Sequence, residues 1–470
     1  MVRRATRFIT GLAVFGLVTG LFAVSSGAST PGAAQGVNKD SIDVVIIVPD
    51  LDTLRAKGIN VGTQSTADFV KRFSGYTDAY GPINGRKVNV IQVGWDPLDA
   101  TSFDKACTAA TQDNKPLVVI NGSGFQTSSI PCISVDNKTP YFSGDMVYSG
   151  LQKASGKNLV SIALPAEVSA AGAVDLIAKT KAIPTSAKIG ILANNVPSIK
   201  AASETLQANF KKRGYNVVSA VEINGLAADS GVLARESTAA VATFQAAGVD
   251  TVINTQSWTS INGFLGEADK TGFKPKLFAV DGQASTCNPF AATRASTLAA
   301  GAQCITAWDG RTAPTKDKIK PDNALEARCR KQYDAATGKT SLPGGPSGPQ
   351  TINGVTYQGD IGPTECMIAN VLLPAIKKAG KNLTWSKVWD NLMATTNAPA
   401  AYISNGQGGF GKNKPYFAAP IMHFTTMAGN TAASPKDANG LFNGCVLPVP
   451  CWVSNVVNGQ EWFKVGTKSG

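Results

Sequence analysis

Histidine is almost absent from this sequence, since His423 is the only one in 470 residues. Multi-histidine metal sites are therefore excluded, and a Ser-His or Cys-His nucleophile would have to use this one side chain. The sequence also lacks Cys-x-x-Cys pairs, a Gly-x-Ser-x-Gly elbow and a phosphate-binding P-loop. We therefore predict no catalytic residue, no metal site and no cofactor. We interpret His423, within a strand-like alternation of residues, as structural.

Charged residues are scarce as well, at 16% of the chain against 43% hydrophobic residues. This balance is typical of a packed globular protein, and the length suits two to three compact units. The formal net charge is +12, but the longest basic run is only Lys211–Arg213. A binding stripe for nucleic acid needs clustered basic residues, so we exclude nucleic acid as a partner.

Long apolar runs are missing except for one uncharged stretch near the start, Phe8–Val24. Three basic residues precede it: Arg3, Arg4 and Arg7. With the small residues that follow, this pattern predicts a secretory signal peptide over residues 1–28, cleaved after Ala28 or, as second choice, after Ala34. An uncleaved anchor helix is the alternative. No cysteine lies near the cleavage point, so we expect an exported protein of the periplasm, cell envelope or extracellular space that is not lipid-anchored there.

Cysteine is present in an even number, which in an exported chain indicates structural disulfides. The eight residues are Cys107, Cys132, Cys287, Cys304, Cys329, Cys366, Cys445 and Cys451. Eight cysteines allow 105 connectivities. We predict the sequential pairing, which is 107–132, 287–304, 329–366 and 445–451.

Val/Ile-rich runs alternate with amphipathic stretches after a Gly/Ala/Ser/Pro-rich linker over residues 29–37. The pattern predicts strands at 42–48, 87–93 and 116–120, with helices at 62–79 and 102–112 between them. The same pattern then repeats: strands at 188–192, 215–221, 250–254 and 276–280, helices at 199–213, 232–247 and 261–270. Strands this apolar are buried on both faces, so each half should contain a parallel sheet.

The rest of the chain is less regular. We predict a strand at 303–308, helices at 323–336 and 364–379, and a strand-like segment at 416–426. Between the two helices, residues 341–349 are too rich in proline and glycine for regular structure.

Several landmarks resemble the type I periplasmic binding proteins, specifically the branched-chain amino-acid type of ABC-transporter substrate-binding protein. They are the opening strand 42–48, the turn Ile83–Arg86, the helix end Lys212–Gly214, the step Gln245–Val252, the strand Leu277–Gly282 and the turn Gly409-Phe410. The resemblance covers about residues 40–425. It implies an α/β fold of two doubly wound parallel-sheet lobes joined by a three-crossover hinge. Lobe 1 would hold residues 38–162 and 292–418, and lobe 2 would hold residues 163–291 and 419–470 with the C-terminal tail.

Loops at the carboxyl ends of these strands are the candidates for holding a ligand. In the first half they supply Ser123, Gly124, Gln126, Thr127, Ser143 and Asp145. In the second half they supply Asn195, Trp258 and Asp281. The family holds a ligand carboxylate at the position of the first loop and pairs an acid at the position of Asp281 with a ligand ammonium. Helix capping, strand-end turns and core packing remain the alternatives for these residues.

The resemblance implies a receptor, not an enzyme, that closes about its hinge on a small organic solute. The solute would be an amino acid or a related amide or carboxylate. The receptor, a monomer, would deliver it to the membrane permease of an ABC-type importer. The loop 49–55 lacks the family's usual Gly/Ser-rich form, which puts branched-chain amino acids themselves in doubt. An envelope sensor or adhesin on the same fold, and a secreted hydrolase, remain the alternatives.

Overall fold

The computed structural model describes most of the chain from Ala34 onward. The described ranges are 34–57, 65–97, 99, 101–122, 129–224, 230–256, 258–281, 298, 301–308, 312–313, 322–341, 350–352, 355–357, 363–427 and 452–466. All of them lie in the compact unit Ala33–Gly470. The predicted signal peptide over residues 1–28 lies outside the described residues.

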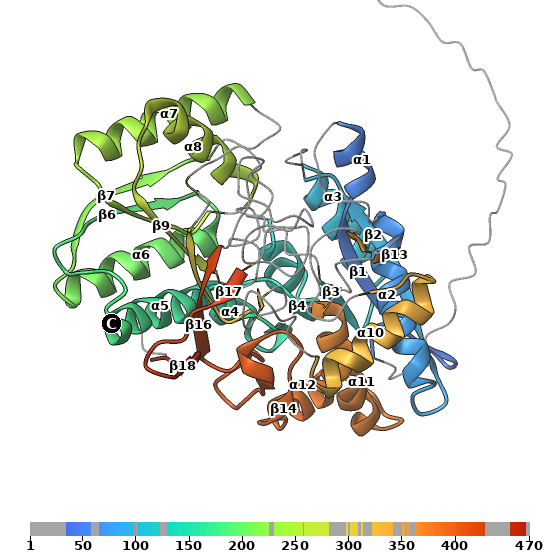
Figure 1. The fold of residues 1–470 in the computed structure, drawn as a ribbon. Coiled ribbons are helices and arrows are strands. Elements are labelled where there is room, and N and C mark those ends of the chain that lie inside the picture. Colours follow the sequence, from blue (N-terminus) through green and yellow to red (C-terminus); the bar gives the residue numbers. More distant parts are fainter. Residues whose placement is uncertain are drawn as a thin grey trace, which may run out of the picture. The chain divides into compact units, whose positions relative to one another are not determined.

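The first sheet has five strands, all parallel, in the order β2-β1-β3-β4-β5 (Figure 1). They are β1 (Ser41–Pro49), β2 (Lys87–Trp95), β3 (Val118–Asn121), β4 (Tyr141–Ser143) and β5 (Leu159–Ser161). The helices and helical turns along the same stretch are α1 (Leu51–Ala56), α2 (Thr66–Tyr80), α3 (Ser102–Thr108), α4 (Ser149–Ser155) and the short π- and 3-10-helical turns Ala109–Asp113, Cys132–Asp136 and Gly156–Asn158.

Strand β1 shows why this sheet is buried on both faces. Its even-numbered residues Val44, Ile46 and Val48 pack into one core with residues of α2, while Val45 and Ile47 pack into a second core with residues of α3. Alternate side chains of a strand point to opposite faces, so a continuous Val/Ile run satisfies two helical layers at once.

Helices from the later part of the chain complete the cover of the first sheet. They are α10 (Ala324–Thr337), α11 (Pro363–Ala379) and α12 (Trp385–Met393). Helices α10 and α11 pack on α2, and α12 packs on α11. Asn323 caps α10 in a capping box with Glu326, just as Ser65 and Asp68 cap α2. Each box satisfies backbone N–H groups that a helix start leaves unpaired.

The second sheet has nine strands and a parallel centre. Its parallel strands are β6 (Lys188–Ala193), β7 (Asn216–Glu222), β8 (Thr251–Asn254), β9 (Lys276–Asp281) and β10 (Gln303–Thr306). Strand β16 (Ile421–Met427) pairs antiparallel with β10. Strands β17 (Trp452–Ser454) and β18 (Trp462–Lys464) pair antiparallel with β16, and β11 (Thr312–Ala313) pairs parallel with β17. Its helices are α5 (Ala166–Thr180), α6 (Pro197–Lys212), α7 (Ser230–Ala246) and α8 (Trp258–Thr271).

Two small antiparallel pairs lie outside these sheets. They are β12 (Gln350–Ile352) with β13 (Val355–Tyr357), and β14 (Ala398–Pro399) with β15 (Gln407–Gly408); a short helical turn at Ser404–Gly406 precedes β15.

The parallel strands of the two sheets follow the same order. When the strands of each half are numbered along the chain, those of the first sheet lie side by side in the order second, first, third, fourth, fifth. The parallel strands of the second sheet, β7-β6-β8-β9-β10, lie in the same order. The predicted α/β class and the pair of doubly wound lobes are therefore confirmed. The chain passes between the two halves three times: after β5, after β11 and just before β16.

One predicted lobe boundary is wrong. Starting the second part of lobe 1 at residue 292 assigns β10 to that lobe, whereas β10 pairs with β9 in the second sheet. The parallel part of the second sheet therefore contains a fifth strand next to β9. The sequence contained no signal for this, because residues 303–306 read equally well as the first strand of a new unit.

The predicted linker over residues 29–37 is wrong at its carboxyl end. Residues 34–37 form a turn, and Val37 is buried in the core and pairs with Ile42. Gly36 has a φ of +70°, and a Cβ there would lie 1.9 Å from the backbone nitrogen of Leu117. Only glycine permits this close approach of two backbones.

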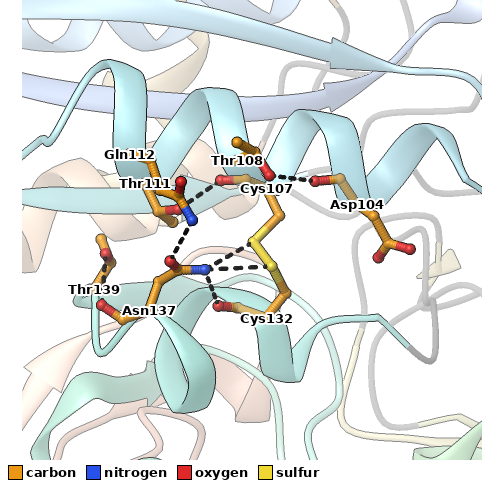
Figure 2. Close-up of a disulfide and its surroundings, with 8 residues drawn as sticks. All are labelled: Asp104, Cys107, Thr108, Thr111, Gln112, Cys132, Asn137 and Thr139. Carbon is orange, nitrogen blue, oxygen red and sulfur yellow. Dashed lines mark hydrogen bonds between the residues drawn. A yellow bond between two sulfur atoms is a disulfide. The ribbon is translucent and has the colours of Figure 1, made fainter. Parts of the chain in front are cut away.

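Two of the four predicted disulfides are confirmed, Cys107–Cys132 and Cys329–Cys366. Figure 2 shows the first, which joins α3 to the helical turn Cys132–Asp136, with the Asn137 amide donating to the Cys132 carbonyl oxygen at 2.8 Å and to both sulfurs. Cys304 is also disulfide-bonded, to a cysteine outside the described residues. Cys287, Cys445 and Cys451 lie outside them too, so the pairs 287–304 and 445–451 stay predictions.

Among the described residues, no helix combines the length and the apolar character that a membrane crossing requires.

Candidate functional site

Each parallel sheet changes its direction of winding between two neighbouring strands. In the first sheet these are β1 and β3, and in the second they are β6 and β8. Connections leaving the carboxyl ends of such strands run to opposite faces of the sheet and leave a crevice where ligands bind. The residues at and just beyond these strand ends therefore form the candidate site.

Three polar side chains meet at the carboxyl ends of β3 and β4. Asn121 ends β3 and stands in register with Ser143, which ends β4. The Asn121 amide donates to Oδ2 of Asp145 at 2.7 Å, and the backbone N–H of Asp145 donates to Oγ of Ser143 at 3.0 Å. Asp145 is only 4% exposed, yet its other carboxyl oxygen, Oδ1, has no hydrogen-bond partner among the residues that the structure describes. A buried polar atom without a partner is costly and marks a place where a ligand can bond.

A buried ion pair lies directly beneath this group. Glu365, in the first turn of α11, accepts from Nη2 of Arg72 on α2 at 2.5 Å, and both side chains are 1% exposed. A Cβ on Gly122 would lie 2.5 Å from the Glu365 carboxyl carbon, and one on Gly144 would lie 2.3 Å from Thr364. The two glycines therefore let the start of α11 approach the ends of β3 and β4.

The surroundings of Asp145 keep its carboxyl neutral. Burial is the main cause, and it raises the pKa of Asp145 from 3.8 to about 8; the negative charge of Glu365 raises it further, and the hydrogen bond from Asn121 opposes the rise. Burial disfavours the charged form of an acid, and a neighbouring carboxylate does the same. With a pKa of about 8, Asp145 is mostly protonated at pH 7.

The second sheet presents amide side chains at the corresponding strand ends. Asn194 follows β6, Asn254 ends β8 and Gln256 lies two residues further on; all three are buried. Gln256 donates to the carbonyl oxygens of Ala193 and Ile223 at 3.0 and 3.3 Å. Three further amide atoms, Oδ1 of Asn194, Nδ2 of Asn254 and Oε1 of Gln256, have no hydrogen-bond partner within the described ranges. Donors and acceptors of hydrogen bonds are thus both available on this side.

A small cavity of about 20 Å³ adjoins the Asp145 group. Its lining is mostly apolar and includes Met146 and Val147, with Tyr148 and Ser143 beside them. Residues 196–198, at the start of α6, close it from the second half of the chain. A cavity of this size holds about one water molecule, so a solute needs the two sides to separate before it enters.

The described residues offer little for metal or histidine chemistry. Nowhere in the described ranges are three or more His, Cys, Asp or Glu side chains placed to hold a metal ion. His423 lies in β16, where its Nε2 is 2.9 Å from the Trp308 carbonyl oxygen and its ring stacks on Trp462 with centroids 3.8 Å apart. These contacts show His423 as a packed, buried side chain.

The sequence-predicted site residues fall into three groups. Ser143 and Asp145 are buried together and line the cavity. Asn195 is exposed, with its N–H bonded to Oδ1 of Asn224 at 2.7 Å. Trp258 begins α8 and Asp281 ends β9, so both stand at the expected ends of elements, although their side chains lie outside the described part. Outside it entirely lie Ser123, Gly124, Gln126 and Thr127.

Sequence reasoning missed Glu365 and Arg72 near Asp145 and the buried amides at the strand ends of the second sheet. Glu365 and Arg72 are 293 positions apart, and nothing local in either helix marks them as partners. Asn254 and Gln256 carried a weak signal, because each is a polar residue at or beyond the end of a Val/Ile-rich strand. A systematic search for such positions would have found them.

No protein-family model matches this sequence, and no curated protein matches it. Solved structures do match. The leucine-binding protein LivK from Thermotoga maritima is 14% identical, with 82% of this chain and 95% of that chain covered and a TM-score of 0.59. A solute-binding protein of an ABC transporter from Rhodopseudomonas palustris BisB5, in complex with 3,4-dihydroxybenzoic acid, is 12% identical over 91% of this chain and 99% of that chain, with a TM-score of 0.61.

A third match is a branched-chain amino acid ABC transporter protein from Thermus thermophilus with bound valine. It is 13% identical, with 83% of this chain and 94% of that chain covered and a TM-score of 0.60. Nearly the whole length of each of these proteins is covered, and 82–91% of this chain is covered in return. The chain therefore has the type I periplasmic binding protein fold.

Proposed function

We propose that this protein is a receptor that captures a small organic solute between its two lobes and delivers it to an ABC-type importer. The observation that carries the proposal is the set of buried polar atoms without partners at the carboxyl ends of both parallel sheets. Asp145 supplies one from the first sheet, and Asn194, Asn254 and Gln256 supply three from the second. Atoms of this kind gain hydrogen bonds when a polar solute enters, which is the energetic basis of capture.

The similar structures support this function. The similar proteins include a leucine-binding protein, one with bound valine and one with bound 3,4-dihydroxybenzoic acid. Each of these solutes is small and carries a carboxyl group. Closure of the lobes about their three connections would trap the solute and bury it. Residues of the predicted loops, including Ser123, Thr127, Trp258 and Asp281, would complete the site.

We propose further that the protein is exported, acts as a monomer without a cofactor, and meets the importer's permease outside the cytoplasm. The N-terminal sequence pattern supports export. The disulfides Cys107–Cys132 and Cys329–Cys366 fit an oxidising compartment, where such bonds persist.

Thermal unfolding with candidate solutes tests the proposed function. A solute that binds only the folded protein raises the melting temperature by mass action. The panel holds amino acids, their amides, short alkylamines, hydroxybenzoates and short peptides, each at 1 mM. We expect at least one class to raise the melting temperature by several degrees. If none does, while the protein turns over a chromogenic ester or glycoside, the receptor proposal is wrong and a hydrolase is favoured.

A further inference from the structure

Three residues in the segment before β15 have an unusual backbone conformation. Tyr402, Ser404 and Asn405 have φ angles of +56°, +51° and +54°. This left-handed region is uncommon for residues other than glycine. Tyr402 and Ser404 are also buried, at 2% and 0% exposed. Strain of this kind persists only where the surrounding structure holds the segment in place, and it is concentrated at functional parts of proteins.

The start of α10 holds this segment to the half of the molecule built on the first sheet. The backbone N–H of Tyr402 donates to Oε1 of Glu326 at 2.7 Å, and the Tyr402 hydroxyl donates to Oδ1 of Asp322 at 3.1 Å. The side-chain amide of Asn323, the N-cap of α10, donates to the carbonyl oxygen of Ala400 at 3.0 Å. Because α10 packs on α2, the segment moves with the helices that cover the first sheet.

Ser404 extends from the same segment and bonds the second half at two places. Its backbone N–H donates to the carbonyl oxygen of Ala307, directly after β10, at 2.6 Å. Its hydroxyl donates to the carbonyl oxygen of Ala419, two residues before β16, at 2.7 Å. Strands β10 and β16 are neighbours in the second sheet. One buried residue of the first half is therefore bonded to two adjacent strand ends of the second half.

The connection that leads into β16 is also bonded to the first connection, which follows β5. The backbone N–H groups of Phe417 and Ala418 donate to the carbonyl oxygens of Ser161 and Ile162 at 2.8 and 2.9 Å. All these bonds join backbone groups, whereas the bond from the Ser404 hydroxyl depends on a side chain. A substitution can therefore remove the hydroxyl bond and leave the others in place.

We propose that Ser404 is the pivot of the hinge, the positioning residue that fixes where the second half turns against the first. In a hinge motion, a few residues at the ends of elements absorb the rotation while the parts farther away move as rigid bodies. A residue held by one half and bonded to two strand ends of the other is suited to this place, and the role explains why its backbone strain is kept. The role rests on the proposed receptor function, because closure of the lobes serves to trap a solute.

The test removes the hydroxyl in two ways. Ser404→Ala and Ser404→Gly both lose the bond to Ala419, but only glycine adopts a left-handed φ freely. The two variants therefore differ in backbone strain and share the loss of the pivot bond. Ser134→Ala is the matched control, because the buried hydroxyl of Ser134 also makes one hydrogen bond, with the Ser155 hydroxyl at 2.8 Å, within the first half.

The motion is measured on the full chain without solute. Spin labels are attached to ketone-bearing amino acids that replace Asp78 on α2 and Glu204 on α6, both exposed positions, so the cysteines stay untouched. Pulsed electron resonance then gives the distribution of distances between the labels. We expect both Ser404 variants to widen this distribution by about 1.5-fold or more, because the halves sample more relative orientations. The control should match the wild type.

Hydrogen exchange gives a second measure of the same loosening. The N–H groups of Phe417 and Ala418 keep their own partners in both variants, so they exchange faster only if the whole connection opens more often. Removing the hydroxyl leaves the buried carbonyl of Ala419 without this partner, which is enough for about a fivefold or larger rise in the rate of local opening. We expect this rise in both Ser404 variants and none in Ser134→Ala.

The outcomes separate a pivot from a residue that only adds stability. An unchanged distance distribution, or unchanged exchange at Phe417 and Ala418, in either folded Ser404 variant would overturn the pivot, whatever happens to the melting temperature. Failure of both variants to fold would assign Ser404 to stability and overturn it too. The receptor function is tested separately by the solute panel: a bound solute without these changes leaves the receptor intact, whereas a confirmed pivot without any bound solute leaves a hinge but no receptor.

Discussion

The strongest prediction concerns how the stability of the ligand-free protein depends on pH through Asp145. Burial raises the pKa of this carboxyl from 3.8 to about 8 in the folded state. In the unfolded chain it returns to its ordinary value. Between these two pH values the folded state therefore binds more protons than the unfolded state, and stability falls as pH rises.

The size of the effect follows from the same shift. The stabilising contribution of the neutral carboxyl is fully present below pH 3.8 and is lost as pH rises through about 8. One pKa unit corresponds to about 1.4 kcal/mol, so the full shift is on the order of 6 kcal/mol. Water entry and relaxation around a buried charge reduce such values. We therefore expect a loss of about 3 kcal/mol from this group between pH 5 and pH 8.

The perturbation is Asp145→Asn, which keeps the shape and the acceptor for the Asn121 amide but cannot ionise. Urea unfolding at pH 5, 6, 7 and 8 gives the free energy of unfolding of both proteins. We expect the difference, variant minus wild type, to grow by about 3 kcal/mol across this range in favour of the variant. A constant offset from the new amide does not affect this slope. Parallel curves for the two proteins would refute the neutral Asp145 and the reasoning built on it.

Three further predictions follow from the same region and from the disulfides. Arg72→Met should cost about 3–5 kcal/mol of unfolding free energy, because it removes the guanidinium that pairs with the buried Glu365 carboxylate; adding Glu365→Gln should recover much of the loss in urea unfolding, and strict additivity would contradict the ion pair. Gly122→Ala should lower the melting temperature, since its Cβ would lie 2.5 Å from Glu365, and an unchanged melting temperature would show that α11 does not approach so closely. Replacing Cys329 and Cys366 together by serine should cost about 3–4 kcal/mol from the 37-residue separation they close; equal stability of the variant and the unreduced wild type would contradict the bond's role.

The sequence predicted the parallel strands well because their signal is local. A run as apolar as Ile42–Val48 predicts a strand in the centre of a sheet, and strand β1 contains the whole run. The strands β4 and β5 were not predicted, because three residues each are too few to show periodicity. Helix α5 was also missed, although its buried alanines pack on α6.

The candidate site was predictable only in part, for a related reason. Ser143 and Asp145 were predicted because the resemblance to the family places a ligand-contact loop at these positions. The role of Glu365 depends on α11 reaching the ends of β3 and β4 from more than 200 residues away. The raised pKa of Asp145 comes from burial and from that distant carboxylate. Neither cause can be read from the residues next to Asp145.

The most direct test of the central claim is to identify the small molecules that the protein retains. The purified full chain is incubated with a filtered extract of small metabolites at pH 8, recovered, denatured, and the released solutes are measured by mass spectrometry. Asp390→Asn, which neutralises an exposed carboxyl of α12 that contacts Lys157, serves as a second intact sample. We predict that both release one small organic solute at close to one molecule per chain. Release of no small molecule above the level of an unrelated exported protein would contradict the account.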